Sequence, residues 1–188
     1  MEIEVSVTHI EDVLIVKHQI AKDTRGFFME CFREDIFTRH NLPTTFVQMN
    51  SSGSYKGVVR GLHFQWDPPM GKLIWVSRGE GFLVAVDIRR ESPTLGQHVS
   101  ITSNEENRIS LWAPAGFARG FVSISKWVEI QYLATGTYNK DSEGNILWND
   151  PDIGIKWPVN QPILSERDKK ALTLTEWLTT KESYNFSI

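Results

Sequence analysis

Short segments of alternating apolar and polar residues, separated by turns, run through most of this sequence. In residues 2–8, Ile3, Val5 and Val7 fall on one face of an extended chain and Glu4 falls on the other, the pattern of a half-buried strand. Further strand-like segments follow at spacings of about ten residues. They are residues 13–16, 46–50, 57–65, 73–76, 82–88, 98–101, 109–113, 117–123 and 128–134. This regular spacing indicates an antiparallel sandwich or barrel rather than βαβ units.

Helical character is confined to two segments outside this strand series. Residues 33–40 are the best helix candidate, because Ile36 and Phe37 supply an apolar face and an Asn-Leu-Pro sequence follows to end the helix. Residues 165–180 can also be helical, since Ser165 is a suitable N-cap and the first turn is acidic. The predicted fold is therefore mainly β with a few short peripheral helices.

The length of 188 residues predicts a single domain that covers residues 1–188. Between the strands we expect a polar loop at 51–56 and a long irregular segment at 138–162, which in a compact domain is usually functional or wraps the core. The aromatic-rich segment 27–32 is interpreted as a strand or a buried extended segment. Residues from about 181 to 188 are interpreted as a weakly held tail.

Composition excludes several classes of function. The net charge is -3 and the pI is about 6.0, so the chain lacks the basic excess of proteins that bind nucleic acids or anionic membranes. The single cysteine, Cys31, excludes an internal disulfide and fits a reducing cytoplasm. The first residues have no basic and apolar regions typical of a signal peptide, and no run of about 18 apolar residues predicts a membrane-spanning helix.

One strand-like segment, residues 57–65, carries polar groups that a core strand does not need. Its apolar and β-branched residues predict a strand, yet it contains Arg60, His63 and Gln65, and Lys72 follows just after a Pro-Pro turn. A surface strand does not require so many apolar residues, and a core strand does not require the charges. The combination predicts a strand that lines a polar cavity.

The familiar signatures of cofactor and nucleophile chemistry are absent from the sequence. The five histidines are scattered over unrelated segments without an H-x-H pair, so no metal site is predicted. The Gly79-Glu80-Gly81 sequence lacks the third glycine and the following helix of a dinucleotide fingerprint. No G-x-S-x-G motif is present. What remains is acid–base chemistry with no cofactor.

The candidates for this acid–base chemistry each have an ordinary structural alternative. His63 is a candidate base, because its usual pKa suits proton transfer near neutral pH, although a histidine in a strand is more often structural. Tyr132 is a candidate proton donor or else a core tyrosine. Asp168 can orient and charge-stabilise His63 or else lie at the surface of a helix. Arg60 and Lys72 can hold an anion or stabilise an enolate.

Many short motifs occur in one order along the chain. They are DTRGFFME at 23–30, FVQMN at 46–50, RGLHFQ at 60–65, GKL at 71–73, VAVDIR at 84–89, SPT at 92–94, GFA at 116–118, GF at 120–121, ILWNDP at 146–151 and LSERD at 164–168. With these motifs, residues 10–169 resemble the dTDP-4-dehydrorhamnose 3,5-epimerase family of cofactor-independent nucleotide-sugar epimerases.

This resemblance implies a fold, an activity and an assembly. The expected fold is a cupin-type jelly-roll barrel that forms a homodimer, with N-terminal strands exchanged between subunits. The expected activity is epimerisation of a nucleotide-linked 4-keto-6-deoxyhexose in the cytoplasm, without metal or other cofactor. The default pathway is rhamnose synthesis for a surface polysaccharide such as O-antigen. The sequence does not decide the nucleotide, the final sugar, or whether C3, C5 or both are inverted.

The resemblance also implies roles for individual residues. His63 is the base and pairs with Asp168, and Tyr132 is the acid on the opposite face of the sugar. The expected substrate-binding residues are Arg25 and Glu30, which would reach the partner subunit's site, together with Gln48, Asn50, Arg60, Lys72, Arg119, Tyr138, Glu143 and Arg167. Among these, Lys72 and Arg60 would serve the C4 oxygen and the diphosphate region, and Tyr138 would stack on the base.

The chain departs from the family pattern at Arg119, where the family usually has histidine. Arginine is permanently charged and presents a planar fork of donors, so it cannot relay a proton as histidine does. We therefore expect Arg119 to affect recognition of the sugar or phosphate, and the alternative of a C3-only or C5-only epimerase on a CDP-, GDP- or dTDP-linked sugar stays open. A ketoisomerase, or a sugar-binding jelly roll without activity, is a further alternative.

Strict alternation along residues 57–65 creates a geometric conflict. It places His63 with Val59, Gly61 and Gln65 on one face and Arg60 on the other. For Arg60 and His63 to reach one ligand, the strand must bulge or twist near Gly61, or Arg60 must act from the edge of the strand.

Overall fold

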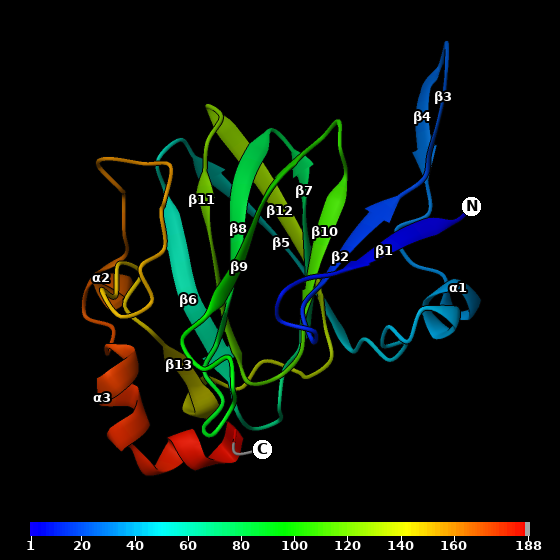
Figure 1. The fold of residues 1–188 in the computed structure, drawn as a ribbon. Coiled ribbons are helices and arrows are strands. Elements are labelled where there is room, and N and C mark those ends of the chain that lie inside the picture. Colours follow the sequence, from blue (N-terminus) through cyan, green and yellow to red (C-terminus); the bar gives the residue numbers. More distant parts are fainter. Residues whose placement is uncertain (187–188) are drawn as a thin grey trace.

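The computed structural model describes residues 1–186 and consists of two antiparallel sheets that face each other, with a separate hairpin at one side (Figure 1). The larger sheet contains, in spatial order, β1 (Ile3–Val7), β2 (Leu14–His18), β10 (Ile109–Ala113), β7 (Lys72–Arg78), β12 (Trp127–Ala134) and β5 (Gln48–Tyr55). The smaller sheet contains β13 (Glu143–Asn145), β6 (Val59–Gln65), β11 (Phe117–Ser123), β8 (Glu80–Asp87) and β9 (His98–Asn104).

The order of strands in space differs from their order in the chain. β10 lies between β2 and β7, and β11 lies between β6 and β8, so the chain crosses repeatedly from one sheet to the other. This arrangement is the jelly-roll barrel that the resemblance implies. The strand positions expected from alternation are confirmed for nearly every segment, and most of these strands place apolar residues in the core.

The main core fills the space between the two sheets. Val76 and Ile130 from the larger sheet pack with Leu83 and Phe121 from the smaller one, and all four are at most 6% exposed. Two further apolar clusters cover the outer faces. Phe37 of α1 (Glu34–Arg39) belongs to a cluster on the larger sheet, while α3 (Leu174–Thr179) contributes to a cluster on the smaller sheet.

A hairpin of β3 (Ile20–Asp23) and β4 (Gly26–Met29) projects away from the barrel (Figure 1). Phe27 and Phe28 on this hairpin are 56% and 65% exposed, so the expectation of a buried segment at 27–32 is wrong for this part. The strand expectation is confirmed for β4. Two large exposed aromatic side chains on a projecting hairpin are unusual in a single chain.

Three other expectations are corrected by the structure. Residues 51–56 are not a loop, because β5 continues through Tyr55 and pairs with β12 along its whole length. Residues 165–180 form two short helices, α2 (Glu166–Lys169) and α3, rather than one. The expected weakly held tail is instead packed against the barrel as far as η2 (Lys181–Phe186), because Phe186 is 5% exposed in the apolar cluster on the smaller sheet. The last two residues of the expected tail lie outside the described residues.

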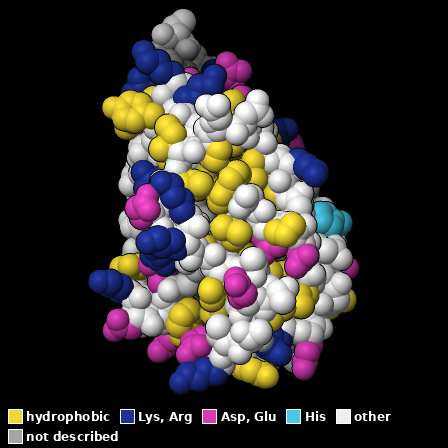
Figure 2. All heavy atoms as spheres, turned by 90° about the vertical axis from the view of Figure 1, so that its left-hand side faces the viewer, with side chains coloured by type: hydrophobic (Ala, Val, Ile, Leu, Met, Phe, Trp, Pro, Cys, Tyr) yellow, Lys and Arg dark blue, Asp and Glu magenta, His cyan; other side chains and the backbone are white. Residues whose placement is uncertain are grey.

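The surface carries both signs of charge. On the face seen in Figure 2, acidic and basic side chains are interspersed around apolar patches, in keeping with the net charge of -3. Within residues 1–186, no helix is both long and apolar enough to cross a membrane.

Candidate active site

A cavity of about 460 Å³ opens between the two sheets at one end of the barrel. Five of its lining residues belong to the smaller sheet, among them Arg60 and His63 of β6, and the others belong to the larger sheet. The full lining is Met49, Asn50, Ser51, Ser52, Arg60, His63, Lys72, Ile74, Arg119, Gly120, Phe121 and Tyr132. A volume of this size is typical of a site for a small molecule.

The cavity lies next to the core, because the same strands that contribute inward-facing core residues also contribute the residues that line it. On β12, buried Ile130 belongs to the core and Tyr132, two residues further, lines the cavity. On β7, buried Val76 belongs to the core, while Lys72 lines the cavity. Because side chains alternate along a strand, polar residues at successive inward positions create a polar site directly beside an apolar layer.

His63 and Asp168 form a hydrogen-bonded pair at the edge of the cavity. The Nε2 atom of His63 lies 2.7 Å from Oδ1 of Asp168, whose side chain is 4% exposed. A carboxylate only accepts hydrogen bonds, so Nε2 of neutral His63 carries the proton and Nδ1 remains as the basic atom. Burial alone raises the pKa of Asp168, but the hydrogen bond and charge interaction with His63 oppose it, and the net pKa is lowered.

The position of Asp168 depends on the start of α2. Ser165 is the N-cap of this helix, and its side chain accepts a hydrogen bond from the backbone N–H of Asp168 at 3.1 Å. The predicted N-cap is thus confirmed, while the Asp168 side chain is hydrogen-bonded to His63. The cap fixes where α2 begins, and the Asp168 carboxylate is held inward by its hydrogen bond to His63 of β6.

Tyr132 lies on the opposite sheet from His63, next to two polar neighbours. Asn50 of β5 is its register partner, and the Asn50 side-chain amide donates to Oη of Tyr132 at 2.6 Å. The Nζ atom of Lys72 lies 4.7 Å from the centre of the Tyr132 ring. Burial, aided by the charge of Arg119, lowers the pKa of Lys72 to about 7 against a smaller opposing effect from Glu143.

Arg119 lies on β11 directly opposite His63 of β6. Its guanidinium is 5% exposed, and Nη1 donates to the backbone carbonyls of Ala113 and Pro114 at 3.3 and 3.0 Å. Within residues 1–186, Nε and Nη2 are buried and have no partner. Burial lowers the pKa of Arg119 to about 9, so the guanidinium still carries its charge at neutral pH. Two donors of a buried cation are left free beside the cavity.

A bulge at Gly61 resolves the conflict between Arg60 and His63. Arg119 pairs with His63 and Phe121 pairs with Arg60, with a register shift between them. Two residues of β6, Gly61 and Leu62, therefore face one residue of β11. The shift brings Arg60 to the same cavity as His63, where Nε of Arg60 donates to Oγ of Ser54 at 3.0 Å.

Both strands need glycine at this crossing. Gly61 has a φ of +138°, which side chains rarely tolerate. A Cβ atom on Gly61 would lie 2.6 Å from the Cα atom of Gly120, and a Cβ atom on Gly120 would lie 2.8 Å from the carbonyl oxygen of Arg60. The close approach of the two backbones is thus a consequence of the glycine pair.

Four of the remaining predicted residues form a connected polar cluster outside the cavity lining. The hydroxyl of Tyr138 donates to Oε2 of Glu143 at 3.0 Å, and Nη1 of Arg167 lies 2.5 Å from the same oxygen. The Tyr138 ring is exposed, and its backbone N–H donates to Gln48. Arg167 directly precedes Asp168 in α2, and Gln48 donates to Asn50. The cluster is therefore linked to Asp168 on one side of the site and to Asn50 on the other.

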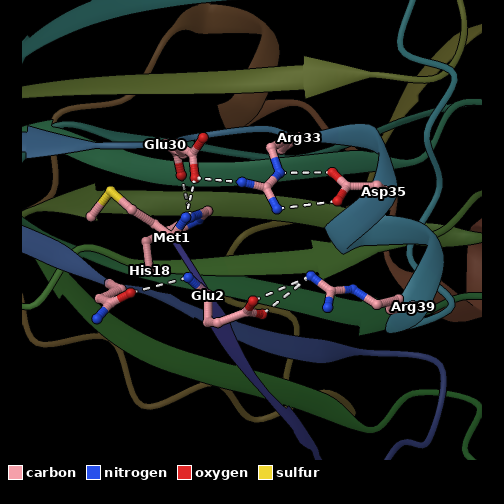
Figure 3. A network of polar contacts seen from close by, with 8 residues as sticks. Met1, Glu2, His18, Glu30, Arg33, Asp35 and Arg39 are labelled. Carbon is pink, nitrogen blue, oxygen red and sulfur yellow. Dashed lines mark hydrogen bonds and ion pairs between the residues drawn. The ribbon is translucent and has the colours of Figure 1, made fainter.

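Arg25 and Glu30 are not brought to this cavity within the chain. Arg25 is on the projecting hairpin, where its Nη2 atom pairs with Asp23 at 2.6 Å. Glu30 lies 2.6 Å from the Met1 ammonium and 3.4 Å from Nη1 of Arg33, in the network shown in Figure 3. Their expected contact with a ligand in a partner subunit stays a prediction.

The sequence reasoning missed the serines of β5. Ser51 and Ser52 line the cavity and Ser54 holds Arg60. The available signal was the alternation Asn50, Ser52, Ser54, which continues the inward face of the preceding residues. It was hidden because serine and glycine favour loops over strands.

The sequence profile of the family described as dTDP-4-dehydrorhamnose 3,5-epimerase matches residues 7–176. The chain belongs to this family. Its sequence is 49% identical over 177 residues to the dTDP-4-dehydrorhamnose 3,5-epimerase of Salmonella typhimurium, with 93% of this chain and 97% of the relative covered. It is also 36% identical over 169 residues to the dTDP-4-dehydrorhamnose 3-epimerase of Streptomyces niveus, with 89% and 82% covered.

A solved structure of the family has the same fold. The dTDP-6-deoxy-D-glucose-3,5-epimerase of Legionella pneumophila, crystallised with dTDP-4-keto-L-rhamnose, superimposes with a TM-score of 0.92 at 40% identity and covers 97% of each chain. The predicted jelly-roll fold and the family resemblance are both confirmed.

Proposed function

We propose that this chain inverts C3 and C5 of a nucleotide-linked 4-keto-6-deoxyhexose, with dTDP-4-dehydro-6-deoxyglucose as the substrate. The observation that carries the proposal is the placement of His63, with Asp168 behind it, on one sheet and of Tyr132 on the other. A sugar ring between the sheets would have a base on one face and an acid on the opposite face. The names of the relatives from Salmonella and Legionella support the substrate class.

The mechanism follows from the acidity of hydrogens beside a ketone. Nδ1 of His63 takes the proton from C3 or C5, and the electron pair moves onto the C4 oxygen as an enolate. The Lys72 ammonium stabilises this charge, an effect whose loss typically costs about 10²–10³ in rate. Tyr132 then returns a proton to the opposite face of the same carbon, which inverts it. One C–H bond breaks and another forms, so no redox or metal cofactor enters the proposal.

The cluster around Glu143 is proposed to bind the nucleotide. The exposed ring of Tyr138 can stack on the base, Gln48, Glu143 and Arg167 supply polar contacts, and Arg60 serves the diphosphate. Glu143 pairs with Gln65 of β6, so this cluster and Arg60 flank His63 along the strand.

We further propose that residues 1–188 form one domain that acts as a homodimer with exchanged N-terminal strands. The projecting hairpin with exposed Phe27 and Phe28 supports this assembly, because a second copy could cover them. Arg25 and Glu30 would then reach the partner subunit's site. The enzyme would work in the cytoplasm, in deoxysugar synthesis for a surface polysaccharide such as O-antigen.

Deuterium exchange tests the proposed reaction. Incubation of the protein with dTDP-4-dehydro-6-deoxyglucose in D₂O should place deuterium at both C3 and C5, read by NMR. CDP- and GDP-linked analogues test the nucleotide. His63→Ala should abolish exchange at both carbons while the protein stays folded. An absence of exchange with all three nucleotides would eliminate the epimerase proposal.

A C3-only or C5-only epimerase is the second candidate, and Arg119 is the observation that favours it. Its charge and free donors next to His63 can hold the ring in one orientation and expose one carbon to the base. The relative from Streptomyces niveus is a 3-epimerase. Deuterium at a single carbon in the same experiment would establish this alternative over inversion of both centres.

A further inference from the structure

Three hydrogen bonds in series connect the backbone after β12 to the hydroxyl of Tyr132. The N–H of Tyr138 donates to Oε1 of Gln48 at 2.7 Å. Nε2 of Gln48 donates to Oδ1 of Asn50 at 3.1 Å, and Nδ2 of Asn50 donates to Oη of Tyr132 at 2.6 Å. Gln48 and Asn50 occupy successive positions on the same face of β5, which is why their side chains can meet in a row.

The direction of this series is dictated by its first member. A backbone N–H can only donate, so the Gln48 atom that faces Tyr138 must be the oxygen. The other end of the Gln48 amide is then the NH₂ group, which only donates, so the Asn50 atom facing it must be oxygen. The NH₂ group of Asn50 is left to face Tyr132. Each amide orientation follows from the bond before it.

A second glutamine fixes the segment from which the series starts. Gln65 of β6, which is 2% exposed, accepts from the backbone N–H of Asn139 at 2.8 Å and donates to the carbonyl of Thr137 at 2.9 Å. It also donates to the carbonyl of Pro68 at 2.9 Å. The two peptide groups that flank Tyr138 are thus clasped from the smaller sheet, and the N–H of Tyr138 is held toward Gln48.

The consequence concerns the proton of Tyr132. Because Asn50 donates to Oη of Tyr132, the hydroxyl accepts there and its own hydrogen must point elsewhere. Tyr132 lines the cavity, and a hydrogen directed away from Asn50 is available to a carbon of the substrate. After the transfer, the same Asn50 donor faces the negative phenolate oxygen, and Nζ of Lys72 lies over the phenolate ring, 4.7 Å from its centre.

We propose that Gln48 and Asn50 are positioning residues that keep the Tyr132 proton directed into the cavity, with a polarity set by the Tyr138 backbone. This inference deepens the proposed function and rests on it. It also assigns a task to Gln65, the buried polar residue of the cavity strand that the acid–base mechanism leaves unexplained. A nucleotide that stacks on the Tyr138 side chain would affect the first hydrogen bond of the series, from the Tyr138 N–H to Gln48.

Asn50→Asp is the variant that reverses the last bond. A carboxylate at this position still accepts from Gln48, but it can only accept from Tyr132, so the phenol proton would be drawn away from the substrate. The base His63 is untouched. Protons removed by His63 would be replaced from solvent on the same face, and deuterium exchange would continue without inversion. We expect the ratio of inversion to exchange to fall about 10- to 100-fold.

Gln48→Glu tests the orientation of Asn50 from the preceding member of the hydrogen-bond series. The new carboxylate accepts from Tyr138 and forces Asn50 to turn its NH₂ group toward residue 48, so Oδ1 of Asn50 would face Tyr132. The ratio of inversion to exchange should fall again, although residue 48 does not contact Tyr132. Gln97→Glu is the matched control, since it makes the same change of charge at an exposed position of the β8–β9 connection and should leave the ratio at the wild-type value.

Measuring both deuterium exchange and inversion separates this inference from the alternatives. Deuterium incorporation and product configuration are read in the same NMR sample, and circular dichroism with thermal unfolding shows that each variant is folded. If Gln48 and Asn50 only bind substrate, KM rises and the ratio stays constant, which overturns the inference. A wild-type protein that exchanges no proton overturns the proposed function itself, a result that the two variants cannot produce.

Discussion

At the scale of single residues, the cavity is lined by three cations that have no carboxylate partner within salt-bridge distance in residues 1–186, namely Arg60, Lys72 and Arg119. Lys72 and Arg119 both line the cavity, and burial lowers the pKa of each. A buried cation without a counter-ion costs stability. Active sites commonly contain such groups, because the charge is needed when an anion or an enolate is present.

Lys72 should therefore make the free protein less stable at neutral pH. Its pKa falls from 10.5 to about 7 on folding, so between these values the unfolded chain binds more protons, and stability rises with pH across this window. Lys72→Met should remove this dependence and stabilise the protein at pH 7 by about 1–2 kcal/mol, as measured by urea unfolding at pH 7 and 9. Lys126→Met, at an exposed position, is the control. A loss of stability at pH 7 on removing Lys72 would contradict the argument.

Arg119 is the residue expected to select between carbons or substrates. Arg119→His replaces a permanent charge and a fork of donors by a smaller, titratable ring. We expect the ratio of deuterium exchange at C3 to that at C5 to change by about fivefold or more, a shift of about 1 kcal/mol in relative barrier. Arg78→His at an exposed position of β7 is the control. An unchanged ratio and an unchanged preference among nucleotides would exclude this role.

At the scale of elements, the crossing of β6 and β11 determines whether Arg60 and His63 share one cavity. Gly61→Ala places a Cβ atom 2.6 Å from the backbone of Gly120, at a φ of +138°. We expect a loss of stability of about 2 kcal/mol or more and a loss of activity of at least tenfold in the folded fraction, measured by thermal unfolding and NMR.

The matched control for this change is Gly154→Ala. Gly154 also has a positive φ of +67°, but its nearest neighbour would be 3.8 Å from the added Cβ atom. This variant should lose about 1 kcal/mol of stability and keep its activity. Equal effects of the two substitutions on activity would show that the crossing is not required.

Elements also show where sequence reasoning succeeds and where it does not. Most strands were predictable because alternation between core and solvent is a local pattern. The extent of β5 was not, since residues 51–54 are Ser-Ser-Gly-Ser, and their extended form comes from pairing with β12. His63 and Lys72 were identifiable as polar residues in an apolar strand context. The inward turn of Asp168 depends on tertiary contacts that its own helix does not encode.

At the scale of the whole molecule, the projecting hairpin is the feature that a single chain does not explain. We expect Phe27→Ser with Phe28→Ser to shift the protein from dimer toward monomer, because these two side chains would be covered by a second copy. Light scattering after size exclusion measures the mass. The variant should also show a higher KM, since Arg25 and Glu30 would no longer reach the partner's site.

Tyr184→Ser is the control for this experiment. Tyr184 is 63% exposed but belongs to η2, a different part of the molecule from the hairpin (Figure 1). It should leave both mass and KM at wild-type values. A wild-type protein that is already monomeric, or a double variant that stays dimeric, would remove the hairpin from the assembly.

Because the site is divided between two sheets, the apolar layer beneath it also sets the distance between its two halves. His63 stands on one sheet and Tyr132 on the other, and the side chains packed between the sheets determine how far apart they are held. Selection for larger or smaller substrates can therefore act on residues that never meet a ligand. A methylene gained or lost at Ile130 or Leu83 would then accompany a change of substrate, just as a substitution in the cavity wall does.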